Sequence, residues 1–179
     1  MAVEDEGRIM KTSLFLSIVA FLVWAGCSLF DTNGSADDPE PRIVFGESLE
    51  GLRIGDDSTT VVETLGAPDE MAQDDFNGDI FRYTEGELAL TEVAVSRDSG
   101  LGLGVIDVRV SAPYGGRTKG GTGVGTPRGE AVAELGEPDT VLERSTGTLE
   151  IYLFESNIFK IDYREGMVFS IHMRALPPN

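Results

Sequence analysis

Apolar and polar residues alternate along three segments near the end of the chain, 149–155, 158–163 and 167–173. A period of two places successive side chains on opposite faces of a β-strand. The residue pairs 156–157 and 165–166 separate these segments and are typical of tight hairpin turns. The pattern therefore predicts a three-stranded antiparallel meander.

Three earlier segments, 80–84, 88–95 and 105–111, show the same succession of three predicted strands. A longer Gly-rich hairpin, 99–104, precedes the third of them. We expect a second three-stranded meander in this part of the chain.

Each predicted meander follows a 19-residue segment, and the two segments, 51–69 and 121–139, resemble each other at a constant offset of 70. Chance identity of about 6–7% per position predicts roughly one shared residue. Seven positions are identical: Gly51/Gly121, Gly55/Gly125, Val62/Val132, Leu65/Leu135, Gly66/Gly136, Pro68/Pro138 and Asp69/Asp139. The sequence therefore indicates an internal repeat.

The repeated segment predicts a short helix with one apolar stripe, formed in the first copy by Val61, Val62 and Leu65. In the second copy, Thr126 is predicted to cap the start of the helix, and Pro127 fits its first position because the ring lacks an N–H. Asp56 occupies the slot of Thr126 in the first copy.

The end of each predicted helix is a Leu-Gly-x-Pro sequence. We expect Gly66 and Gly136 to adopt positive φ as left-handed C′ residues, and Pro68 and Pro138 to prevent the helix from resuming. Helices of about ten residues do not persist alone in water, so they must pack on a sheet. The predicted fold is α+β, with two tandem repeats, 43–114 and 115–179. Each repeat is a short helix followed by a three-stranded antiparallel meander, with the helices packed on one sheet face.

The N-terminal part of the sequence resembles a bacterial lipoprotein signal. An apolar run, 14–24, follows Lys11 and is too short to span a bilayer. Translation from Met10 would give a signal peptide of ordinary length; otherwise the first nine residues are an unusual extension. We assign 1–26 to the signal peptide.

The run ends in Ala25-Gly26-Cys27, which closely resembles a lipobox, although Trp24 stands where that pattern prefers Leu. The resemblance implies cleavage after Gly26 and lipidation of Cys27 with acyl chains such as palmitate. Residues 27–42 then form an acidic, flexible tether. A free Cys at the end of an ordinary signal peptide or anchor helix is the alternative.

The net charge and the counts of Cys and His exclude several classes of ligand. The net charge of −17 opposes binding to nucleic acid or to anionic lipid headgroups. A single Cys and a single His exclude a four-Cys zinc site and a His-rich metal centre, so we predict no metal and no cofactor.

With its Gly-x₅₋₆-Val-x₂-Leu-Gly-x-Pro opening and aromatic-rich meander, each repeat resembles the SmpA/OmlA (BamE-like) outer-membrane lipoproteins. It is also similar to the tandem halves of the β-lactamase-inhibitor-protein-like fold. The resemblance covers about 45–175. It implies assistance in the assembly of outer-membrane β-barrels in the first case and inhibition through a sheet surface in the second, with no catalytic site in either. This chain differs from the first family, which has one copy per chain, because it has two copies. It differs from the freely secreted inhibitors of the second because it has a lipobox.

Two loop motifs fail on spacing. The Gly-rich stretch 115–125 lacks the GxxxxGK[ST] order of a phosphate loop, because Lys119 follows Thr118, and is better interpreted as a flexible connector. The segment 75–79 resembles half of a calcium loop, but Ile80 and Gly86 stand where Gly and Glu are required. A turn before a strand is the preferred interpretation.

His172 could act as a general base with Ser170 as nucleophile and Asp162 as orienting group, but no G-x-S-x-G elbow exists. A half-exposed strand histidine is the simpler interpretation. We therefore predict that the protein is not an enzyme.

The meanders also predict a face turned away from the helices. If Phe159, Ile161, Tyr163, Phe169, Ile171 and Met173, with Ile106, Val108 and Val110, face the helices, the intervening residues face outward. The candidate partner-binding residues are Arg109, Lys160 and His172, with Tyr152 and Phe154. The alternatives are a solvated sheet face or an interface at the 117–119 connector.

The predicted function is that of a lipid-anchored extracytoplasmic binding or scaffold protein in envelope assembly or maintenance, with a protein partner. The location is the outer membrane where the organism has one and the cell membrane otherwise. An inhibitor-like or small-ligand-binding lipoprotein is the alternative, and an envelope hydrolase a remote one.

Overall fold

The computed structural model describes residues 41–73, 77–98 and 104–176. No helix in these ranges is long and apolar enough to cross a membrane. The predicted signal peptide, the cleavage after Gly26, the lipidated Cys27 and most of the tether lie outside the described residues. Ile43, where the first predicted repeat begins, opens the first strand and is 1% exposed.

The described chain contains ten strands, two α-helices and a 3₁₀ helix at Gly86–Leu88. The α-helices are α2 (Ser58–Leu65) and α3 (Arg128–Leu135). The strands are β1 (Ile43–Val44), β2 (Ser48–Leu49), β3 (Glu70–Gln73), β4 (Gly78–Tyr83), β5 (Thr91–Ser96), β6 (Gly104–Ser111), β7 (Thr140–Arg144), β8 (Gly147–Leu153), β9 (Asn157–Arg164) and β10 (Met167–Ala175).

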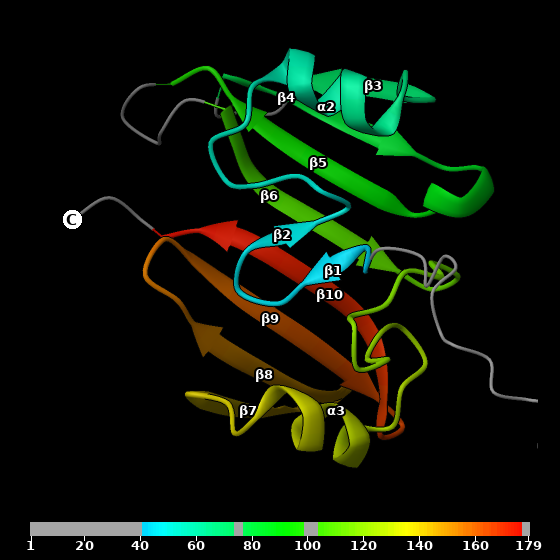
Figure 1. Cartoon of the computed structure of the whole chain (residues 1–179), viewed down its shortest axis with the longest axis vertical. Coiled ribbons are helices and arrows are strands. Elements are labelled where there is room, and N and C mark those ends of the chain that lie inside the picture. The colour runs from blue at the N-terminus through cyan, green and yellow to red at the C-terminus, as the bar shows by residue number, and fades with distance from the viewer. Residues whose placement is uncertain (1–40, 74–76, 99–103, 177–179) are drawn as a thin grey trace, which may run out of the picture. The chain divides into compact units, whose positions relative to one another are not determined.

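Eight of these strands form one antiparallel sheet in the order β3-β4-β5-β6-β10-β9-β8-β7, while β1 and β2 form a separate hairpin (Figure 1). The two meanders join where β6 pairs with β10, with His172 opposite Arg109. Strands β3 and β7 are the outer edges of the sheet.

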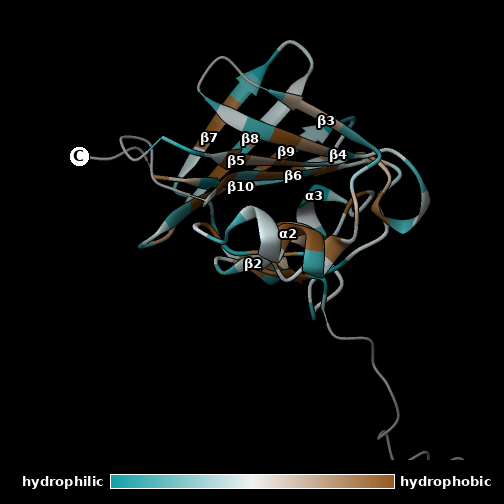
Figure 2. Cartoon of the chain, turned by 90° about the horizontal axis from the view of Figure 1, so that it is seen from above, coloured by the Kyte–Doolittle hydropathy of each residue, from teal (hydrophilic) through white to brown (hydrophobic). Residues whose placement is uncertain are grey.

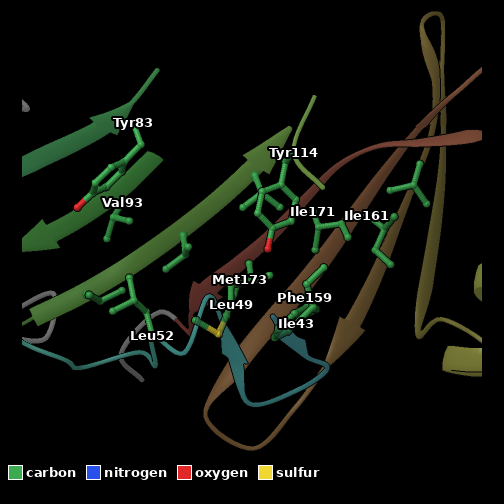
Figure 3. Close-up of a cluster of buried hydrophobic side chains, with 14 of the residues drawn as sticks. Ile43, Leu49, Leu52, Tyr83, Val93, Tyr114, Phe159, Ile161, Ile171 and Met173 are labelled. Carbon is green, nitrogen blue, oxygen red and sulfur yellow. The ribbon is translucent and has the colours of Figure 1, made fainter. Parts of the chain in front are cut away.

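Helices α2 and α3 and the β1–β2 hairpin cover one face of the sheet, and the other face is open (Figure 2). The core lies beneath this cover, where Leu49 and Leu52 meet strand residues such as Phe159 and Met173 (Figure 3). All four of these side chains are fully buried, because each sits at an inward position of its strand or under the hairpin.

The predicted α+β fold of two tandem helix-plus-meander repeats is wrong. The protein is mostly β, with one continuous eight-stranded sheet, a two-stranded hairpin and only two short α-helices in the described residues. Each helix is followed by four strands, not three. The sequence pattern missed β3 and β7 because these edge strands are largely exposed and show no buried apolar period.

The helix ends agree with the prediction in φ but not in ψ. Gly66 has φ 83° and ψ −174°, and Gly136 has φ 87° and ψ −178°, so positive φ is confirmed at both. A left-handed residue has ψ near +45°, whereas this extended region with positive φ is almost restricted to Gly. Pro68 and Pro138 follow in non-helical backbone.

The predicted helix starts are wrong by one residue. Asp57 caps α2 by accepting a hydrogen bond from the Thr60 N–H at 2.7 Å, and α3 begins after Pro127 without a side-chain cap. The hydroxyl oxygen of Thr126 instead accepts from the N–H of Gly123 at 3.0 Å. Asp56 likewise accepts from the N–H three residues earlier, so this shared slot closes a turn before each helix.

Two β-bulges correct the predicted sheet faces. The register between β10 and β9 shifts between Val168 and Ser170, which buries Val168 and turns Phe169 out of the core. A second shift, opposite Ala94 and Val95, leaves Ile106 only half-buried. The other residues predicted to face inward on these strands are buried.

Candidate functional site

The open face of the sheet carries a row of charged side chains that runs across six strands. Its members pair directly across the strands and therefore lie on the same face. In sheet order they are Glu70, Arg82, Glu92, Arg109, His172 and Lys160. The predicted outward positions Arg109, Lys160 and His172 thus come from three neighbouring strands and meet at the centre of this face.

Basic residues collect on this face although the chain has a net charge of −17. Alternation along the strands places six bases there: Arg82, Arg109, Arg144, Lys160, Arg164 and Arg174. The same rows hold four acids: Glu70, Glu92, Asp107 and Asp162. The face is therefore locally basic within an acidic protein.

Three of these six bases are already paired with acids of the face. Arg82 donates to Glu92 at 3.0 Å, Arg144 lies 3.4 Å from Asp162, and Arg174 lies 3.8 Å from Asp107. Arg109 and Lys160 form neither an ion pair nor a hydrogen bond with another residue of the described chain. Both act electrostatically on the nearby Asp107, but no ion pair holds either side chain, so they can pair with an acidic partner.

Two grooves lie on the open face at one end of the sheet, on either side of Arg109 and Phe169, which line both. The first has a volume of about 290 Å³ and includes Tyr83, Leu90 and Ala112 in its lining. The second has a volume of about 200 Å³ and is lined by charged and polar residues, among them Arg144, Arg164, Asp162 and Ser170.

The bulge in β10 places Phe169 between the grooves. Its ring lies 3.5 Å from the guanidinium carbon of Arg164, a cation–π contact that holds the arginine against the face. Leu90, at the mouth of the first groove, is 50% exposed and has φ 61°. A branched apolar residue rarely adopts positive φ, and such strain is found preferentially at functional sites.

Asp162, Ser170 and His172 lie together but do not form a catalytic triad. Ser170 Oγ lies 3.2 Å from His172 Nε2 and donates to Asp162 Oδ2 at 3.3 Å, while Asp162 Oδ2 also lies 3.6 Å from the same Nε2. In a triad the serine and the carboxylate bind opposite ring nitrogens. Ser170 is also only 1% exposed, so this geometry does not support nucleophilic attack.

The ionisation of the face follows from burial and the neighbouring charges. Burial, with Arg109 next in importance, lowers the pKa of His172 to about 4, and this outweighs the opposing effect of Asp162. Burial raises the pKa of Asp107 to about 6 despite the nearby Arg174. At neutral pH His172 is therefore uncharged, and the positive charge of the face comes from arginine and lysine alone.

Tyr152 and Phe154, predicted to join this face, lie on the covered side of the sheet. Tyr152 is 4% exposed and contacts the Phe45 ring edge-on at a centroid distance of 4.9 Å. Phe154 packs edge-on against Phe45 and Phe159. The placement of both is a correction: in β8 the inward positions are Glu150 and Tyr152, so the aromatic residues of this strand end contribute to the core.

No family model matches the sequence, and no curated protein matches it. Among solved structures, an extracellular protein with an SCP domain from Bacillus anthracis strain Ames aligns over 79% of this chain with 9% identity and a TM-score of 0.52. A cysteine-rich secretory protein from Staphylococcus aureus strain Mu50 aligns over 78% with 11% identity and a TM-score of 0.52.

A DUF4309 family protein from Bacillus subtilis strain 168 aligns over 72% of this chain and 84% of its own length, with 15% identity and a TM-score of 0.47. The chain spans about half the length of the first two neighbours, 50% and 47%. These likenesses concern the fold. No match names the SmpA/OmlA family, so that resemblance stays a prediction.

Sequence reasoning missed a buried charge beneath α3. Glu150 is fully buried on the covered face, where Arg128 donates to its Oε1 at 2.7 Å and the Tyr152 hydroxyl donates to its Oε2 at 3.1 Å. Burial is the main cause of the raised pKa of Tyr163, with Glu150 next. Alternation along β8 could have revealed this carboxylate, because Glu150 shares the parity of Tyr152.

The Gly-rich connector also differs from the expected flexible segment. The carboxylate of Glu134 in α3 accepts hydrogen bonds from the Gly120 N–H at 3.0 Å and from the Thr122 N–H at 2.9 Å. Arg117 donates to the carbonyl oxygen of Gly121 at 2.7 Å, which ties the loop to itself. The alternative interface at 117–119 is therefore a structured loop, with Lys119 exposed on it.

Proposed function

We propose that this protein is an extracytoplasmic binding protein in envelope assembly or maintenance, held at a membrane by lipid on Cys27. Its open sheet face binds an acidic region of a protein partner, and it acts by binding rather than catalysis. The anchor is needed because the net charge of −17 opposes electrostatic attraction to anionic lipids, whereas buried acyl chains supply about 0.8 kcal/mol per CH₂. The outer membrane is the proposed site where the organism has one.

The observation that carries this proposal is the pair of bases Arg109 and Lys160, which form no ion pair among the described residues and lie at the centre of a sheet face that no described helix covers. Arginine and aromatic side chains dominate the energy of many protein interfaces, and Phe169 lies beside Arg109 on this face. The two grooves, about 290 and 200 Å³, lie at or below the lower end of the range for ordinary ligand pockets, about 300–1,000 Å³, and the bases are spread across a sheet face, which favours a protein partner over a small ligand.

The test is crosslinking in intact cells followed by mass spectrometry, comparing the wild type with the double variant Arg109→Glu/Lys160→Glu. We expect the variant to lose the crosslinked partner while its Tm stays within a few degrees, because neither residue forms an ion pair among the described residues. The control, Lys119→Glu, reverses the charge of an exposed lysine of the connector, outside the row. Loss of the partner in the control alone would move the interface to the connector.

The anchor is tested in the same cells with a labelled fatty acid. The Cys27→Ser variant should lose the label and leave the membrane fraction, since no other cysteine exists in the chain. A variant that is still labelled and fractionates like the wild type would contradict lipidation at this residue.

A further inference from the structure

The two grooves of the open face have different chemistry but share a wall. Arg109 and Phe169 line both of them, so a ligand that fills one groove meets the other directly. The first groove presents apolar surface from Leu90, Ala112 and Phe169. The second presents three guanidinium groups, from Arg109, Arg144 and Arg164.

The second groove has an excess of positive charge. Its carboxylate, Asp162, lies 3.4 Å from Arg144 and also accepts from Ser170, so it is already engaged. Arg164 is held by the ring of Phe169, and Arg109 forms no ion pair within 4 Å in the described chain, although it acts electrostatically on Asp107. Guanidinium groups bind carboxylates in bidentate geometry, so the groove is suited to a carboxylate.

The first groove keeps an apolar side chain exposed at a strained position. Leu90 is 50% exposed with φ 61°, a backbone conformation that Asn or Gly would adopt with less strain. The exposed half of this side chain offers apolar surface to a partner at the first groove.

We propose that the two grooves form one site for an extended segment of a partner protein in which an apolar side chain stands next to a carboxylate. The apolar side chain occupies the groove of Leu90, and the carboxylate binds between Arg109 and Arg144. A volume of about 290 or 200 Å³ accommodates a single side chain, and the local excess of bases complements an acidic segment. This inference rests on the proposed function and specifies what the open face recognises.

The experiment measures fluorescence anisotropy of three labelled ten-residue peptides with the full chain carrying Cys27→Ser. The peptides have Gly-Ser flanks and a central Leu-Glu, Leu-Gln or Ser-Glu pair. We expect the Leu-Glu peptide to bind at least about tenfold more tightly than either of the others, as expected for loss of a charged hydrogen bond or of a buried side chain. Equal binding of all three peptides, or none by any, would overturn the proposal.

Two variants assign each half of the ligand to its groove. Arg109→Gln should remove the preference for Glu over Gln and keep that for Leu over Ser, whereas Leu90→Asn should do the reverse and, since Asn tolerates positive φ, keep the fold. Arg174→Gln is the control, because Arg174 shares the face but lines neither groove. If both variants weaken all peptides equally, the grooves do not divide the ligand as proposed.

Decanoate joins an apolar chain to a carboxylate without a peptide and tests the source of this chemistry. Its binding in the absence of peptide binding would overturn the assignment to a protein segment. The outcome for the proposed function is separate. If crosslinks to a partner depend on Arg109 and Lys160 but the peptides show no preference, the proposed function stands and the groove assignment fails. If the peptides show the preference but no crosslink depends on these residues, the groove assignment stands and the proposed function fails.

Discussion

Phe81 in β4 and Glu150 in β8 occupy corresponding places under the two helices. Phe81 pairs with Val93 on the next strand, as Glu150 pairs with Ile161. Two residues further along, the hydroxyl oxygens of Tyr83 and Tyr152 lie 3.1 and 3.4 Å from the carbonyl oxygen of the glycine that ends the overlying helix. The backbone frame is thus the same in both regions.

The side chains under the two helices differ in chemistry. Phe81 is 3% exposed and makes an apolar core, whereas Glu150 is fully buried and bonded to Arg128. Ser58 opens α2 where Arg128 opens α3, so the region with the carboxylate also has the arginine to neutralise it. In this ion pair the carboxylate is fully buried and the arginine side chain is 42% exposed, so loss of the arginine leaves a buried charge without compensation, which is expensive. The region under α3 therefore depends on a single arginine in a way that the region under α2 does not.

The largest expected effect comes from removing that arginine. Arg128→Ala should lower the free energy of unfolding by about 3 kcal/mol, since it leaves Glu150 buried with only the Tyr152 hydroxyl as a hydrogen-bond partner. Urea unfolding at pH 7 measures the change. The double variant Arg128→Ser/Glu150→Phe copies the region under α2 and should recover most of the loss. A cost below about 1 kcal/mol for Arg128→Ala would show that the two regions do not differ as argued.

A smaller and equal effect is expected at the helix ends. An added Cβ meets nothing within 4 Å at Gly66 or Gly136, so Gly→Ala at either tests backbone strain alone. We expect about 1–3 kcal/mol at each, similar in both regions. Asn should be no better than Ala, because ψ near 180° lies outside the left-handed region. Unequal costs would show that packing, not strain, decides one of the two ends.

The smallest effect is a pH dependence confined to the region of α3. Burial opposes ionisation of Glu134, but hydrogen bonds from Thr118, Thr122 and Gly120 outweigh it and lower its pKa. A lowered folded pKa stabilises the protein above the ordinary glutamate pKa, and this stabilisation disappears as the pH falls through the folded pKa. Glu134→Gln should therefore cost up to about 1 kcal/mol at pH 7 and nothing in acid, measured by urea unfolding across pH. Thr64→Val, at the corresponding position of α2, is the control without pH dependence.

The alternation of apolar residues located six of the eight strands of the large sheet, because inward positions such as Ile161 and Met173 must be apolar to fill the core. It missed β3 and β7 for the same reason: an edge strand that buries nothing carries no such pattern. The pattern also cannot show how many meanders join one sheet, since the pairing of β6 with β10 links residues about 60 positions apart.

The candidate site was predicted in part. Outward positions for Arg109, Lys160 and His172 follow from strict alternation and agree with the structure. Phe169 was misplaced because a bulge inserts one residue and reverses the faces beyond it. Tyr152 and Phe154 were misplaced because aromatic residues suit a core and an interface equally well, and only the cover formed by Phe45 decides between them.

Strand β10 has a consequence for the order in which the protein is made. It stands between β6 and β9 at the centre of the sheet, yet 167–175 is the last strand of the described chain. During synthesis or export from the N-terminus, β6 is an unpaired edge until these residues emerge, and such edges invite pairing with other chains. A chain that stops before Met167 keeps both helices but cannot join its two halves, so the sheet itself distinguishes finished chains from truncated ones.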